Sequence, residues 1–143
     1  MILSEQTSST PLIKVIPDKG LFYVKGRAMP ENPAEVFGSL IDFTKEYSKN
    51  PKPNTLVRFE LEFVNSTSLR YITLFIRAFT LSGNCNFTIE WYSKGVEEIL
   101  PKGQSLKDFF EVLTQSVQCK KYLLIKTKPD IAIEEKTERF ILN

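Results

Sequence analysis

Residues 55–68, TLVRFELEFVNSTS, contain the strand and the turn on which the fold of this chain depends. Apolar and charged side chains alternate up to residue 64, with one face formed by Val57, Phe59, Leu61 and Phe63 and the other by Arg58, Glu60 and Glu62. This period of two predicts a β-strand with one buried face and one face toward water. After the turn at residues 65–68, a period near 3.6 predicts a helix with an apolar stripe made of Leu69, Ile72, Phe75, Ile76 and Phe79.

The rest of the chain continues the alternation of strands and helices. Two strands are predicted at 12–16 and 21–25, around a turn at 17–20. A helix follows, capped by Asn32 with Pro33 at its first position, and leads to the strand at 55–64. The next helix is closed by residues 82–84, and after it come a strand at 86–92, a helix from Ser105 to about 117 and a strand at 121–126. The order β-β-α-β-α-β-α-β indicates an α/β fold with a largely parallel sheet after an N-terminal hairpin. The charged faces of the strands at 55–64 and 86–92 favour helices packed mainly on one side of the sheet. An edge position for one of these two strands would also explain the alternation.

A length of 143 residues favours one domain. Residues 1–10 are rich in serine and threonine and are expected to be flexible, which leaves residues 11–127 as the domain. The charged tail at 128–143 would add a strand, pack as a helix or stay mobile, and its sequence favours none of the three.

The composition argues against most enzyme classes. The chain has no histidine, which removes Ser-His-Asp and Cys-His catalysis and HExxH zinc sites, and it has no glycine-rich phosphate loop. Cys85 and Cys119 match no metal or disulfide pattern. A net charge of +2 gives no argument for nucleic acid, and neither a signal peptide nor a membrane span is visible, so we expect a cytoplasmic protein without metal or cofactor.

The NSTS turn holds the one group of residues whose chemistry suggests a function. Its hydroxyls, Ser66, Thr67 and Ser68, come where a strand ends and a helix begins, beside the free NH groups and the positive end of the helix dipole. A phosphate there would be stabilised by those NH groups and by Arg70, and would bring about −2 charges to the surface without unfolding the helix. The alternative is that Asn65 or Ser66 merely caps the helix.

Two neighbouring features are candidates for partner contacts. Glu31 and Asn32 lie in the loop after the second predicted strand, which should end at the same sheet edge as the NSTS turn. The polar sheet face could be a docking surface or simply a solvated one; it carries Arg58, Glu60, Glu62, Glu90 and Tyr92.

Three segments together resemble the SiaC family of bacterial regulatory phosphoproteins, formerly a domain of unknown function. They are GRAMPENPAEVFGSLIDFTKEY (26–47), LVRFELEFVNSTSLRYITLFI (56–76) and FTIEWY (87–92). The shared pattern is a glycine, PEN, an apolar helix, a strand that ends in Asn and three hydroxyl residues, and a strand with Trp-Tyr. The similarity covers roughly residues 10–126.

The resemblance implies a STAS-like (SpoIIAA-like) fold and a regulatory role in a partner-switching pathway. A Ser/Thr protein kinase would phosphorylate the turn, a PP2C-type phosphatase would reverse this, and the unphosphorylated form would bind a diguanylate cyclase and so control cyclic di-GMP and biofilm formation. By position the phosphoacceptor is Ser66, directly after Asn65. Thr67 is the alternative, because the family pattern has threonine followed by two serines.

The positions around the turn and on the neighbouring loop give the residues that we expect to meet a partner. The partner-binding residues would be Glu31, Asn32, Asn65, Thr67, Ser68 and Arg70, with no catalytic residue, no nucleic acid and no membrane involved. The alternative hypotheses are a STAS-type binding or scaffold domain that is never phosphorylated and an anti-sigma factor antagonist.

Overall fold

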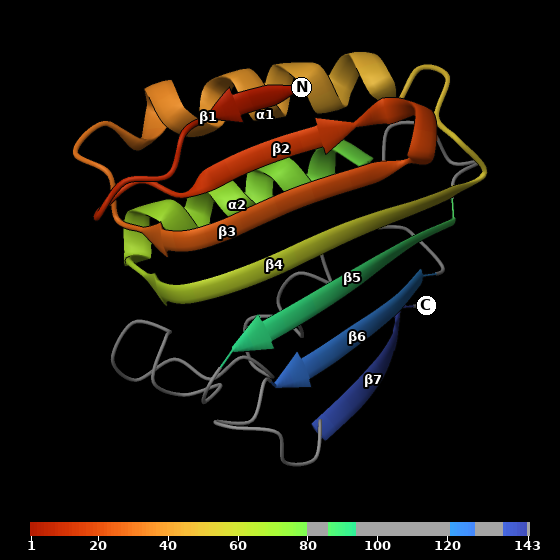
Figure 1. Ribbon diagram of the computed structural model, residues 1–143. Coiled ribbons are helices and arrows are strands. Elements are labelled where there is room, and N and C mark those ends of the chain that lie inside the picture. Colours follow the sequence, from red (N-terminus) through yellow and green to blue (C-terminus); the bar gives the residue numbers. More distant parts are fainter. Residues whose placement is uncertain (80–85, 94–120, 128–135, 143) are drawn as a thin grey trace.

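The computed structural model describes residues 1–79, 86–93, 121–127 and 136–142. These residues form a seven-stranded sheet in the order β1-β2-β3-β4-β5-β6-β7 with two helices. The bounds are β1 Ile2–Ser4, β2 Leu12–Ile16, the 3-10 turn η1 Pro17–Lys19, β3 Leu21–Ala28, α1 Pro33–Tyr47, β4 Asn54–Val64, α2 Ser66–Ala78, β5 Asn86–Ser93, β6 Lys121–Thr127 and β7 Lys136–Leu142. Figure 1 shows α1 and α2 against the same face of the sheet.

The pairing of the strands confirms the α/β, STAS-like fold class. Strands β3, β4, β5 and β6 are parallel neighbours, whereas β1, β2 and β7 each run antiparallel to the strand they join. Because β4 and β5 both lie inside the sheet, the edge-strand explanation of their alternation is wrong. The helix predicted from Ser105 to about 117 and the helix end predicted at 82–84 fall outside the described residues.

Both termini add strands, the first where flexibility was expected and the second where a strand was one of three open alternatives. The first ten residues were expected to be flexible, but Ile2–Ser4 pair with β2, and Met1 exchanges two hydrogen bonds with Val15: its ammonium donates to the Val15 carbonyl at 3.0 Å and its carbonyl accepts the Val15 NH at 2.9 Å. At the other end, Lys136–Leu142 pair with β6. The sheet therefore extends beyond the expected domain limits of residues 11–127 on both sides.

The β2–β3 hairpin depends on Gly20. This residue has a left-handed backbone with φ 62° and donates its NH to the Pro17 carbonyl at 3.0 Å. A Cβ atom at this position would come within 2.6 Å of the Asn54 carbonyl oxygen, so no other residue fits without movement of the backbone.

The hydrophobic core lies between the sheet and the two helices. It contains Phe22 from β3, Phe37 and Leu40 from α1, Phe59 from β4, and Ile72, Phe75 and Ile76 from α2. Phe22 touches rings from both helices, including Phe43 and Phe79. The five apolar residues predicted as the buried stripe of the second helix are all buried.

A β-bulge near the end of β4 changes the predicted face of one residue. Gly26 pairs with Leu61 and Arg27 pairs with Phe63, so Glu62 is an extra residue in β4. Beyond this bulge Val64 is buried, and Phe63 is half-buried beneath the guanidinium of Arg27, 5.6 Å from its ring centre. The prediction that Phe63 shares the buried face with Phe59 and Leu61 is therefore wrong.

Candidate functional site

The loops after β3 and β4 meet at one edge of the sheet. Ala28 and Val64 are paired at the ends of these two parallel strands, and the NH of Asn65 donates to the Ala28 carbonyl at 3.1 Å. Figure 1 shows α1 and α2 starting at this same edge. The structure thus brings the loop with Glu31 and Asn32 to the edge that holds the NSTS turn; both residues are exposed.

Asparagine side chains cap both helices at this edge. The Oδ1 atom of Asn65 accepts the NH of Ser68 at 2.8 Å, and α2 begins at Ser66. Asn32 caps α1 by accepting the NH of Glu35 at 3.4 Å, and its own amide donates to the Glu35 carboxylate at 3.3 Å. Since Asn65 supplies the cap of α2, none of the three hydroxyls is needed for capping.

The three hydroxyls of the turn have different environments. Ser66 and Thr67 are exposed, and their hydroxyls form no hydrogen bond with any residue that the structure describes. Ser68 is fully buried, and its hydroxyl has no partner within the described part of the chain. Only Ser66 and Thr67 are therefore open to a modifying enzyme in the folded protein, and the Ser68 side chain is not on the surface that a partner would touch.

The first turn of α2 can accommodate a negative charge. It contains no acidic residue, and Arg70 is exposed on the next turn. The NH of Ser68 is taken by Asn65, but the first NH groups of a helix have no partner within it and carry the positive end of its dipole. A phosphate on Ser66 or Thr67 would add the missing charge at this end and stabilise the helix by about 0.3–1 kcal/mol.

The cap of α2 gives a test of this local geometry. Asn65→Ala removes the acceptor for the Ser68 NH, and we expect it to lower the free energy of unfolding by about 1 kcal/mol in urea denaturation. Asn65→Asp keeps the acceptor and adds a favourable charge, so it should unfold at the same or a higher urea concentration than the wild type. Equal stability of the alanine variant and the wild type would show that Asn65 does not cap the helix.

The face of the sheet opposite the helices carries two polar pairs. The Tyr23 hydroxyl donates to the Glu60 carboxylate, and Arg58 donates through Nε to Glu90 at 2.9 Å. Arg58 and Glu90 also form an ion pair, in which the carboxylate side chain is only 11% exposed. The prediction that this face is solvated is thus wrong for Glu90, whose side chain is largely buried beside Arg58.

Tyr23 gives this face a pH dependence. Burial, and next the hydrogen bond to Glu60, raise the pKa of Tyr23 from its usual value near 10 to about 12. Because the folded pKa is the higher one, the stability that comes from the neutral phenol is complete below pH 10 and is lost as the pH rises from about 10 to about 12. In the Tyr23→Phe variant, the free energy of unfolding should no longer show the decrease that this phenol causes between about pH 10 and about pH 12. Urea denaturation at several pH values measures this difference. Superimposable profiles for the variant and the wild type would contradict the raised pKa.

No helix in the described part of the chain is long and apolar enough to cross a membrane. Across residues 1–79 and the described strands, no three histidine, cysteine, aspartate or glutamate side chains come together as a possible metal site.

The described residues thus form an α/β sheet with two helices on one face and exposed hydroxyls at the start of α2, consistent with a STAS-like fold. The profile of the SiaC family of regulatory phosphoproteins matches residues 4–119. The chain therefore belongs to the SiaC family.

Solved structures agree with this fold. Apo-SiaC from Pseudomonas aeruginosa is 17% identical with a TM-score of 0.60, over 82% of this chain and 93% of that chain. A second similar structure is the crystal structure of diguanylate cyclase SiaD in complex with its activator SiaC, from the same organism. The matched chain is 17% identical with a TM-score of 0.64, over 86% of this chain and 96% of that chain. Among curated proteins, none matches the chain in sequence.

Proposed function

We propose that this chain is a cytoplasmic interaction protein that binds and regulates a diguanylate cyclase when its NSTS turn carries no phosphate. The observation that carries the proposal is the exposure of Ser66 and Thr67 at the first two positions of α2, where Asn65 already supplies the cap. Membership of a family of regulatory phosphoproteins and the complex of a similar protein with a diguanylate cyclase support it.

The proposed switch acts by charge. A phosphate on Ser66 or Thr67 would bring about −2 charges to the exposed sheet edge and would be held by the first turn of α2, while the buried stripe of that helix stays in place. A cyclase surface that fits the uncharged turn would then face the phosphate. The phosphate would repel acidic groups of the cyclase, and its bound water would have to be removed on binding. Glu31, Asn32, Asn65 and Arg70 would form the rest of the contact surface around the turn.

A Ser/Thr protein kinase and a PP2C-type phosphatase would set the phosphorylation state. Their presence is inferred from the family resemblance, and the exposed hydroxyls are the groups that such enzymes require. The role of the chain itself would be regulatory rather than catalytic, with no cofactor, and its effect would be a change in cyclic di-GMP.

The test is to incubate the protein with its cognate kinase and ATP and to map the phosphate by peptide mass spectrometry. We expect it on Ser66 or Thr67 and on neither in the Ser66→Ala/Thr67→Ala double variant. The Ser68→Ala variant is the matched control and should be phosphorylated like the wild type, because that hydroxyl is buried. Phosphate found on neither Ser66 nor Thr67 would refute the assignment of the site.

A second candidate is a STAS-type binding domain that works without phosphorylation, and a groove on the open sheet face favours it. In that case, ligand addition would raise the melting temperature of a protein that no kinase modifies. An anti-sigma factor antagonist would use the same turn but would bind a different partner.

A further inference from the structure

We propose that the open face of the sheet is a second docking surface, which binds an acidic segment of a protein partner that also presents an apolar side chain. This surface lies opposite the helices and is formed by residues other than those of the NSTS turn. The proposal does not depend on phosphorylation of the turn.

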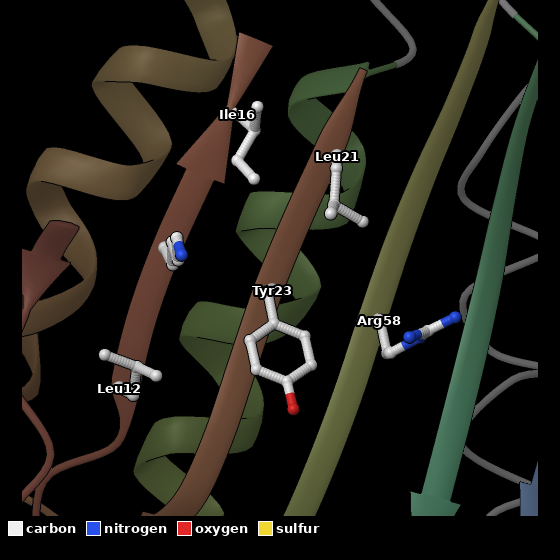
Figure 2. A pocket seen from close by; sticks show the side chains of 6 residues that line it. Leu12, Ile16, Leu21, Tyr23 and Arg58 are labelled. Carbon is white, nitrogen blue, oxygen red and sulfur yellow. The ribbon is translucent and has the colours of Figure 1, made fainter. Parts of the chain in front are cut away.

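A groove of about 310 Å³ lies on this face. Figure 2 shows its side chains standing out from β2, β3 and β4 on the side away from the helices. The groove has an apolar part made of Leu12, Ile16 and Leu21 and a polar part made of Lys14, Tyr23 and Arg58. An apolar side chain with a carboxylate near it would match both parts.

The charges of this face are uneven. Strands β2, β3 and β4 contain three exposed cations, which we call the basic face: Lys14, Lys25 and Arg27. None of the three forms an ion pair with a residue that the structure describes. Among the nearby carboxylates, Glu90 is paired with Arg58, and Glu60, the register neighbour of Lys25, keeps its charge while it accepts the Tyr23 hydroxyl. Glu62 is the one exposed carboxylate on these three strands, so exposed cations outnumber exposed carboxylates there by three to one.

The basic face therefore attracts carboxylates, and a carboxylate-rich segment would gain an ion pair with each of three cations that pair with no carboxylate in the described part of the chain. Arg27 already contacts the Phe63 ring and the Met29 sulfur, so its gain would be the smallest of the three. A second copy of this chain is a poor occupant, because it would bring the same cations into contact.

The size and shape of the groove favour a protein segment over a small molecule. A pocket for a small ligand usually encloses most of the ligand, whereas this groove lies along the surface of the sheet (Figure 2) and is at the lower limit of volume for such pockets. An extended or helical segment can place one apolar side chain in the groove while its acidic residues reach the basic face.

The far end of the basic face comes close to the NSTS turn. Arg27 lies over the half-buried ring of Phe63, and Phe63 precedes Asn65 by two residues. One partner could thus contact both the docking surface and the turn.

The experiment uses the full chain and a short fluorescent peptide of alternating glutamate and leucine, with binding measured by fluorescence anisotropy. We expect the peptide to bind and to be released as the salt concentration rises. The Lys14→Glu/Lys25→Glu double variant should bind it about tenfold more weakly, and the neutral Lys14→Gln/Lys25→Gln variant should fall between the two. Lys45→Glu, an exposed lysine on α1, is the matched control and should bind like the wild type.

Two further probes separate the alternatives. A peptide with serine in place of leucine should bind more weakly, because it leaves the groove empty, and a lysine–leucine peptide should not bind. Failure of the glutamate–leucine peptide to bind, equal binding by the charge-reversed double variant, or binding to phosphatidylserine vesicles without binding to the peptide would each overturn the proposal.

Discussion

Replacing Phe22 with alanine should lower the free energy of unfolding by about 3–5 kcal/mol. Phe22 is fully buried, and its ring lies 6.0 Å from that of Phe43, 5.0 Å from Tyr47, 5.9 Å from Phe75 and 4.9 Å from Phe79. These four rings come from α1, α2 and the residue that caps α2, so Phe22 of β3 joins the sheet to both helices. Because the four rings around the cavity belong to different elements, a shift of one element cannot fill it. The expected loss of unfolding free energy is therefore at the upper end for a core substitution.

Urea denaturation followed by circular dichroism measures this loss. Leu74→Ala is the matched control, because Leu74 lies on α2 but is 46% exposed, and its removal should change the unfolding free energy by no more than about 0.5 kcal/mol. Similar losses for the two variants would mean that Phe22 is not central to the packing of the helices on the sheet.

The second large effect concerns binding. Ser66→Asp places a permanent negative charge at the first position of α2, and we expect it to weaken binding to the diguanylate cyclase at least about tenfold. The fold should be unaffected, because Ser66 is exposed and an acidic residue is favourable at a helix start, so the far-UV circular dichroism spectrum should match that of the wild type.

Ser39→Asp is the matched control for the charge itself. Ser39 is an exposed serine in α1, and the same substitution there should leave cyclase binding unchanged. If Thr67→Asp weakens binding and Ser66→Asp does not, Thr67 is the switch residue. If neither substitution weakens binding, a negative charge on the turn is not what releases the partner.

The local patterns in the sequence predicted a large part of the fold. The alternation in residues 55–64 and the apolar period after residue 68 predicted β4 and α2, because each pattern follows from the backbone period of its own element. Asn32 was recognisable as a cap for the same reason, because the capping contact spans only three residues. For the second helix the sequence left Asn65 and Ser66 as alternatives, and the structure shows Asn65.

Contacts between distant segments accounted for the errors. Strand β1 is only three residues long and is held by pairing with β2, for which its own sequence gives no signal. The bulge at Glu62 arises from the match between β3 and β4, so the alternation of β4 alone placed Phe63 on the wrong face. Glu90 is paired with Arg58 in the adjacent strand, a contact that the alternation of its own strand cannot reveal.

The sequence placed the NSTS turn between a strand and a helix, as the structure does, but it did not distinguish the exposure of the three hydroxyls. Ser66, Thr67 and Ser68 look equivalent as a string of hydroxyls, yet Ser68 precedes Ile72 by four residues and Phe75 by seven, which places it on the buried stripe of α2. This period was already visible in the sequence and would have removed Ser68 from the accessible hydroxyls. The choice between Ser66 and Thr67 is different, because both side chains are exposed and their exposure does not distinguish them.

The most direct test of the proposed switch is the affinity of one preparation for the diguanylate cyclase before phosphorylation, after complete phosphorylation and after phosphatase treatment. We predict that the unphosphorylated protein binds, that phosphate on Ser66 or Thr67 lowers the affinity by about a hundredfold, and that its removal restores binding. Equal affinity of the fully phosphorylated and unphosphorylated protein would contradict the proposed switch.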